Sequence, residues 1–453
     1  MVQITVSDPR IEQPETRHTF TSYLVSTKEG NSVRRRYSDF RWLYQRLQTE
    51  VPGAIIPIIP HTRTLMSTKK FNLELIEERR RDLQEFLVAV TKHAELCRAP
   101  SMTPFMLLDL GKSFDDGKTK VEQSMPTTSE VMKWAEEVTN TEASKASVAR
   151  KGIGRIFAKI RLSAGAQQLL TTEDESQIPG LYAYIAEVSR QAKALVKASD
   201  SLLKSTLISA DAHHEIGVPI GLWKTTYMQQ NGNQDDDVGN MMEGICHFSD
   251  EISILLRKKH KEEEFLFAHN VHKLANSVSA FEIALSQRKK AQVDCTHCNN
   301  TMLEKNAALE KAQKNLKPPE VTDKLNCERV ELESRIEIEK ERFDQITKRL
   351  LKDADKYKPR LVQMVKECFL MFAKAQISYT TRINEAYQRM LPLLEEVGSD
   401  DGEKSEDSGS HHPPSDSPPR QVGSDDGEKS EDTSSNHPPS YPPPPPPNDD
   451  GES

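Results

Sequence analysis

The stretch Val33–Phe40 reads VRRRYSDF: three consecutive arginines are followed by the aromatic residues Tyr37 and Phe40. Before it, His18–Thr27 (HTFTSYLVST) alternates in the manner of a β-strand, and Lys28–Asn31 (KEGN) is a typical turn. Ser32–Tyr37 is therefore predicted to return as the second strand of a hairpin. The apolar residues that follow lie at helical spacing, so a helix is expected to begin near Ser38.

Two further motifs follow the hairpin. Pro57–Pro60 reads PIIP and belongs to a loop that is expected to be extended. Leu75–Leu83 reads LIEERRRDL and lies in a helix predicted from Leu73 to about Thr91. Together these elements indicate a small α+β domain over residues 1–112.

The arginines of this domain suggest that it binds a phosphorylated headgroup. A guanidinium donates two parallel hydrogen bonds to a phosphate, and an aromatic ring can pack flat against an inositol. Arg36 and Tyr37 would face opposite ways in a regular strand, so they can serve one site only if the strand ends there. A solvated basic strand edge, a common protection against aggregation, is the simpler interpretation.

Residues 171–396, called the rod below, contain few prolines and are predicted to form three long helices. The breaks fall at Asn231–Asp237 (NGNQDDD) and Lys317–Glu320 (KPPE). Long helices of this kind are expected to pack side by side and to need a second chain to bury their apolar stripes. The stripe of the second helix is typical of a coiled coil and contains Ile245, Phe248, Ile252, Leu255, Phe267, Val271, Leu274, Val278, Phe281 and Leu285.

Residues 113–170 read as a polar linker, apart from the segment 147–163 (SVARKGIGRIFAKIRLS). This segment contains five cations and no acid. A basic amphipathic helix lying in the headgroup region of a membrane has this pattern, and a linker helix docked on the rod is the alternative. The face expected to enter the membrane consists of Ile153, Ile156, Phe157 and Ile160.

The chain of 453 residues has a formal net charge of −8, which is unevenly distributed. Residues 397–453 have a net charge of −11, and the sequence VGSDDGEKSED occurs in them twice, 25 residues apart. So polar a tail is expected to be disordered. Pro438–Tyr441 (PPSY) fits a WW-domain ligand, and the run Pro442–Pro447 fits a WW or SH3 ligand, although both equally fit an inert spacer.

Several classes of protein are not expected. No stretch approaches 18 uncharged apolar residues, the first residues do not read as a signal peptide, and the six scattered cysteines favour a reducing cytosol. We find no phosphate loop, nucleophile elbow or catalytic carboxylate pair, so neither an enzyme nor a cofactor is expected. A metal site is not expected either, because Cys295 and Cys298 lack a second pair, and His269 and His272 lack a third ligand.

The order and spacing of RRRYSDF, the PIIP loop and IEERRRDLQEFL resemble the PX domain of sorting nexins. The resemblance implies that Arg36 holds the 3-phosphate of phosphatidylinositol 3-phosphate, that Tyr37 packs on the inositol ring, and that Arg79 binds the ring hydroxyls. The family usually places a lysine after the PxxP motif to contact the 1-phosphate. This chain has Arg63 near that position, with Lys69 and Lys70 as alternatives.

The rod resembles the dimerising BAR domain of the same sorting nexins, above all in its last helix. The resemblance implies a homo- or heterodimer whose cations face an anionic membrane. The basic groups expected there are Arg257–Lys259 with Lys261, Arg288–Lys290, Lys311, Lys314, Lys317, Lys348–Arg349, Lys352, Lys356 and Lys358.

Both resemblances together imply a cytosolic protein that lies peripherally on early endosomes. It would bind, bend and tubulate their membranes in cargo sorting and retrograde transport, alongside a retromer-like complex or in an autophagy-related route. No nucleic-acid partner is expected. The alternative is a coiled-coil membrane tether or scaffold without curvature activity.

Overall fold

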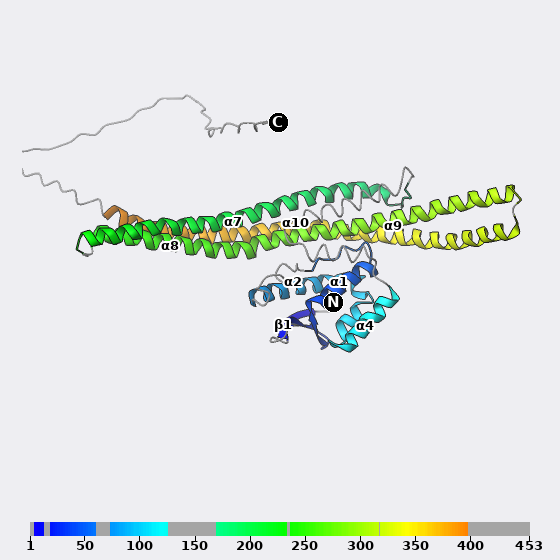
Figure 1. The fold of residues 1–453 in the computed structure, drawn as a ribbon, viewed down its shortest axis with the longest axis horizontal. Helices are drawn as coiled ribbons and strands as arrows, with labels where there is room; N and C mark the ends of the chain where they lie inside the picture. The colour runs from blue at the N-terminus through cyan, green and yellow to red at the C-terminus, as the bar shows by residue number, and fades with distance from the viewer. Residues whose placement is uncertain are drawn as a thin grey trace, which may run out of the picture. The chain divides into compact units, whose positions relative to one another are not determined.

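The computed structural model describes residues 4–12, 19–59, 73–125, 169–232, 236–316 and 318–396 (Figure 1). The segment 147–163 and the tail 397–453 lie outside the described residues. The expected fold class is confirmed: a small α+β domain is followed by long helices.

The N-terminal domain is built on an antiparallel sheet with the order β1-β2-β3. β2 (Phe20–Thr27) and β3 (Ser32–Arg36) form the predicted hairpin, whereas β1 (Ile4–Glu12) was not predicted. The register of β1 shifts between Ser7 and Arg10, where Asp8 has a positive φ of 45°. A bulge of this kind lets an edge strand containing Pro9 stay paired.

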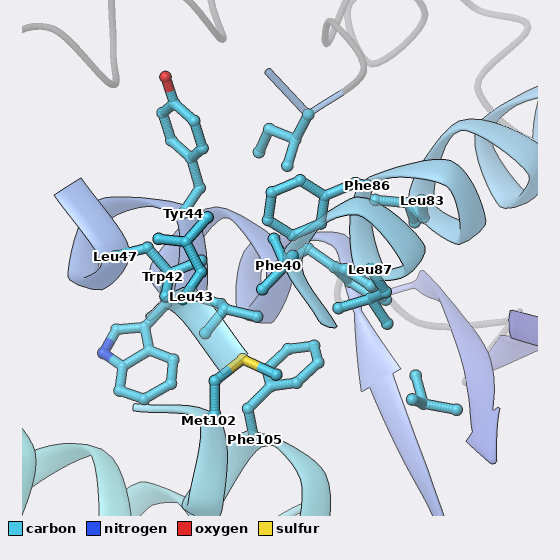
Figure 2. Packing of buried hydrophobic residues seen from close by; sticks show 14 of the residues in the cluster. Phe40, Trp42, Leu43, Tyr44, Leu47, Leu83, Phe86, Leu87, Met102 and Phe105 are labelled. Carbon is cyan, nitrogen blue, oxygen red and sulfur yellow. The ribbon is translucent and has the colours of Figure 1, made fainter. Parts of the chain in front are cut away.

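Helices cover the sheet and close its core (Figure 2). α1 (Tyr37–Glu50) and α2 (Leu73–Lys92) match the two predicted helices. They are followed by a 3-10 turn, η2 (Leu96–Arg98), and by two more helices, α3 (Met102–Leu107) and α4 (Lys112–Ser124).

Helix α4 lies in the range that was expected to be a linker, yet it packs into the N-terminal domain. Its Phe114 is completely buried, with its ring centroid 6.4 Å from that of Phe105 and 5.6 Å from that of Trp42. Edge-to-face aromatic contacts of this kind stabilise a core beyond the area they bury. The packed unit therefore continues past residue 112.

The rod has the predicted three-helix organisation. A 3-10 turn, η3 (Glu175–Gln177), leads into α7 (Ile178–Gln230). The second helix consists of α8 (Asp237–Glu263), a π-helical turn η4 (Glu264–Ala268) and α9 (His269–Lys314), and α10 (Pro319–Glu396) returns beside it. In Figure 1, α9 and α10 continue as a pair beyond the first residue of α7.

The predicted stripe of the second helix is buried from the π-helical turn onward. Phe267, Val271, Leu274, Val278, Phe281 and Leu285 are each at most 5 % exposed. They pack with residues of α7 and α10, including Ile185 and Leu361. The stripe therefore forms the core of a single protomer.

Candidate functional site

The three consecutive arginines of β3 have different environments. Arg34 lies along the sheet, where its Nε donates to the Ser22 hydroxyl at 2.9 Å and its Nη1 pairs with Asp8 at 3.0 Å. These partners hold its guanidinium against β1 and β2. Arg34 therefore stabilises the sheet.

Arg35 is completely buried and faces α3. Its guanidinium donates to the carbonyl oxygens of Phe105 at 2.9 Å and Pro104 at 3.1 Å, and also to that of Leu108, while its Cζ lies 4.0 Å from the Phe114 ring centroid. Burial lowers the pKa of Arg35 to about 10, and the nearby Asp39 and Asp109 carboxylates oppose this shift. Arg35 thus satisfies the last carbonyls of a short helix and has a structural role.

Arg36 differs because 44 % of its side chain is exposed. β3 ends at this residue, which has an extended conformation and precedes α1. Its backbone N–H donates to the Asp39 carboxylate at 3.0 Å, and its Nε lies 3.5 Å from the other carboxylate oxygen. The expected strand end is therefore present, and it leaves the Arg36 guanidinium facing solvent.

Tyr37 and Arg79 lie together next to Arg36. Tyr37 is the first residue of α1 and packs its ring partly against the core. The Arg79 guanidinium, on α2, lies 5.3 Å from the Tyr37 ring centroid. Burial raises the pKa of Tyr37, although Arg79 and Arg41 oppose this shift. The structure thus brings together three of the four predicted headgroup residues, and the fourth, Arg63, lies outside the described residues.

Two further residues belong to this neighbourhood and were not predicted from the sequence. Asp39 is buried, and its Oδ1 lies 3.4 Å from Lys118 Nζ as well as near Arg36. Lys118 belongs to α4, so no local pattern connects it to the motif. Asp39 had a signal in its spacing, since an acid three residues after the residue that precedes a helix is a capping position.

The N-terminal domain also packs against the rod through charged side chains. The His269 imidazole of α9 lies between two carboxylates of α2, with Nδ1 2.6 Å from Glu78 and Nε2 3.3 Å from Asp82. Lys273 pairs with Asp82 at 2.7 Å. The expectation that His269 lacks further ligands was wrong, because the two carboxylates come from a helix almost 190 residues away.

Glu78, Asp82 and His269 are close enough to hold a metal ion, but their arrangement favours an ion pair. The carboxylates lie on opposite ring nitrogens, and Lys273 already neutralises Asp82. Burial lowers the pKa of His269, but the hydrogen bonds that its ring donates to the Asp82 and Glu78 carboxylates outweigh this effect and raise the pKa to about 9. His269 is therefore an imidazolium that donates from both nitrogens at neutral pH.

Two arginines of the predicted membrane-facing clusters face inward instead. Arg288 is 1 % exposed, lies 4.8 Å from the Phe343 ring centroid and pairs with Glu175. Arg349 pairs with Glu95 of the N-terminal domain at 2.7 Å. The expectation that these two guanidinium groups face a membrane was wrong, since a count of charges does not reveal which of them a core or an interface uses.

Large apolar side chains remain exposed where α7, α8 and α10 run together. Ala210 of α7 and Ala386 of α10 share a small cluster with Ile252 of α8, which places these stretches side by side. The exposed residues are Leu207, Ile208, Ile216, Val218, Leu222 and Trp223 on α7 and Val362, Val365, Phe369, Leu370, Met371, Ile377, Tyr387, Leu391, Leu393 and Leu394 on α10. We call this set the apolar face; exposed apolar side chains that are this numerous on neighbouring helices often mark an interface.

Among the described helices, none has a stretch both long enough and apolar enough to cross a bilayer.

Comparison with known proteins agrees with both parts of the fold. The family model described as "PX domain" matches residues 23–109, and that described as "Vps5 C terminal like" matches residues 226–393. Sorting nexin 1 of Arabidopsis thaliana is 22 % identical over 402 residues, which cover 87 % of this chain and 92 % of that protein. Sorting nexin-30 of Mus musculus is 34 % identical over 102 residues, 20 % of this chain and 23 % of its own length.

A solved structure has the same fold. The cryo-EM structure of the SNX-BAR Mvp1 tetramer superposes with a TM-score of 0.54 at 14 % identity, over 86 % of this chain and 99 % of the other. The protein therefore joins a PX domain to a BAR-like helical domain. It is homologous to sorting nexin 1 and has both domains of the sorting nexins of the PX-BAR type, a family of peripheral proteins that bind and curve membranes during sorting.

The raised pKa of His269 predicts that the contact between α2 and α9 weakens in alkali. A group whose pKa rises on folding stabilises the fold fully below its unfolded pKa, near 6.5, and loses this contribution as pH rises through about 9. We expect His269→Gln to lower the midpoint of thermal unfolding clearly at pH 6, and to have little effect at pH 10.

The matched control is His272→Gln, which removes a similarly exposed imidazole that faces Asp200 inside the rod. The change that it causes in the midpoint of thermal unfolding is the effect of losing an α9 imidazole that does not contact the PX domain. An equal effect of His269→Gln at pH 6 and pH 10 would contradict the ion-pair assignment.

Proposed function

We propose that this protein is recruited to early endosomes by phosphatidylinositol 3-phosphate and curves their membranes as a dimer during cargo sorting and retrograde transport. The observation that carries the proposal is that the three consecutive arginines of β3 have different environments. Arg34 and Arg35 are engaged inside the PX domain, whereas the Arg36 side chain is 44 % exposed and precedes Tyr37, whose ring Arg79 approaches.

The chemistry of this site suits a phosphorylated inositol. Arg36 would donate a charge-assisted pair of hydrogen bonds to the 3-phosphate, and Tyr37 would support the ring. Arg79 is 5 % exposed and would bond the ring hydroxyls from beneath Tyr37. Arg63 would contact the 1-phosphate.

The apolar face of the rod supports dimerisation. Its residues remain exposed on a single protomer whose helices already share buried clusters, so a second copy or a related chain would cover them. Packing of two such faces would place the PX domains of both protomers in one assembly.

Further parts of this function rest on the sequence. The amphipathic face of segment 147–163 would enter the headgroup region and add area to one leaflet. The motifs at Pro438–Tyr441 and Pro442–Pro447 would attract a WW or SH3 protein, and a retromer-like complex would supply cargo.

Arg36→Ala is expected to weaken binding to vesicles that contain phosphatidylinositol 3-phosphate by on the order of 10–100-fold. The reason is the loss of charge-assisted hydrogen bonds of about 1.5–3 kcal/mol. Vesicle flotation measures this effect, and Arg34→Ala provides the control because Arg34 belongs to the same motif but is held by the sheet. Undiminished headgroup-selective binding of Arg36→Ala would refute the site.

Ile377→Asp is expected to turn a dimer into a monomer at micromolar concentration, because it places a charge at one of the most exposed isoleucines of the apolar face. The control is Ile338→Asp on the same helix, which changes an isoleucine of similar exposure, 65 % against 68 %, outside the apolar face. Analytical ultracentrifugation measures both. A monomeric unmodified protein, or a dimeric Ile377→Asp variant, would contradict the proposed interface.

The double substitution of Ile156 and Phe157 by Glu is expected to abolish tubule formation while most vesicle binding persists. The acids prevent insertion and repel anionic lipid, whereas the PX site is unchanged. Removal of residues 397–453 is the control and should leave tubulation intact. Electron micrographs of liposomes distinguish the outcomes, and full tubulation by the double variant would favour a simple linker.

A further inference from the structure

The segment Val51–Ile59, called the stitch loop below, connects α1 to the part of the chain that precedes α2. It has no helical or strand structure, yet most of its residues are buried. A buried irregular segment needs partners for its backbone polar groups. Within the described part of the loop, the rod supplies several of these partners.

Three side chains of the rod bind the backbone of the stitch loop. The Gln287 side-chain oxygen accepts a hydrogen bond from the Gly53 N–H at 2.6 Å, and the Asp353 carboxylate accepts one from the Ile55 N–H at 3.1 Å. Arg349 donates to the Pro52 carbonyl. These three residues lie on α9 and α10.

The approach of the loop to α10 requires a glycine. Gly53 has a φ of +83°, and a Cβ atom at this position would lie 2.9 Å from both the Ile346 side chain and the Ile346 carbonyl oxygen. Such a conformation is strained for other residues, and the space is closed to them. The close packing of the stitch loop on α10 therefore depends on the backbone at Gly53 and at Ile346.

The isoleucines of the stitch loop divide between two cores. Ile55 packs in the core of the rod, with Leu350 and Ala354, whereas Ile56 and Ile59 pack in the PX core. Ile76 of α2 belongs to the same PX core, and Tyr37 packs against it. If the loop shifted on the rod, Ile56 and Ile59 would move and would disturb the PX core against which Tyr37 packs.

Asp353 joins two separate parts of the PX domain. Besides Ile55, its carboxylate binds His93 Nε2, at 3.0 Å from each oxygen. His93 Nδ1 accepts the backbone N–H of Leu96 at 3.1 Å, so the proton lies on Nε2 and points at Asp353. One buried carboxylate therefore holds the stitch loop and the end of α2.

We propose that the rod acts as part of the headgroup site, with Gln287, Arg349 and Asp353 as positioning residues that keep the stitch loop in its binding conformation. This proposal rests on the proposed function, since it concerns affinity for the same phosphoinositide. If these contacts are lost, only a fraction of the molecules is competent to bind, and the measured affinity falls by that fraction. By reciprocity, headgroup binding tightens the contact between PX domain and rod.

The test measures binding of a soluble short-chain phosphatidylinositol 3-phosphate to the full chain by calorimetry. Asp353→Ala is expected to weaken binding on the order of tenfold, about 1.4 kcal/mol. The control is Asp355→Ala, which removes the same charge from an exposed position two residues further along α10 and should bind like the unmodified chain. Binding to vesicles of phosphatidylserine alone should be equal for both variants.

Equal headgroup affinity of Asp353→Ala and Asp355→Ala overturns the positioning role and leaves the proposed function intact. An unmodified chain that does not bind the soluble lipid overturns the proposed function, and this inference with it. If Asp353→Ala does not fold, Gln287→Met replaces it, because methionine keeps the volume and removes the partner of the Gly53 N–H. A loss of affinity in that variant supports the proposal, and an unchanged affinity overturns it.

Discussion

The Asp353 carboxylate, on the longest helix of the rod, accepts hydrogen bonds from two segments of the PX domain. It is almost completely buried, so its oxygens would lack hydrogen-bond partners in the interior if these two segments moved away. The stitch loop likewise could not remain buried without the rod. Because each needs the other, the contacts with α9 and α10 fix the orientation of the PX domain.

The contacts between the PX domain and the rod fix how the headgroup site is oriented relative to α9 and α10. Arg79 lies on α2 between Glu78 and Asp82, both of which face His269 of the rod. Glu78 and Asp82 thus bind α9, while Arg79 itself approaches Tyr37.

Much of this architecture was predictable because it is periodic. The hairpin, α1, α2 and the long helices repeat apolar residues at strand or helix spacing, and their breaks contain glycine, proline or acid runs. β1 was missed because ITVSDPRIE contains Asp8 and Pro9, which disfavour a strand, while pairing with β2 and a bulge override them. α4 was missed because a single phenylalanine anchors an otherwise polar helix.

The contacts between the domains could not be predicted in this way. Gly53 and Gln287, or Ile55 and Asp353, are separated by more than 230 residues, and no local pattern relates them. For the same reason Arg288 and Arg349 looked like membrane-facing cations. In the headgroup motif the sequence could suggest Arg36, but it could not show that Arg34 and Arg35 are engaged elsewhere.

Amide hydrogen exchange across residues 51–59 of the full chain tests most directly whether the PX domain and the rod form one packed unit. The account predicts that the amides of Gly53 and Ile55 exchange as slowly as those of α10 around Leu350. It also predicts that they become fast in Asp353→Ala, while those of the PX core helix α2 around Phe86 stay slow. Fast exchange at Gly53 and Ile55 in the unmodified chain, with α1 and α10 protected, would contradict it.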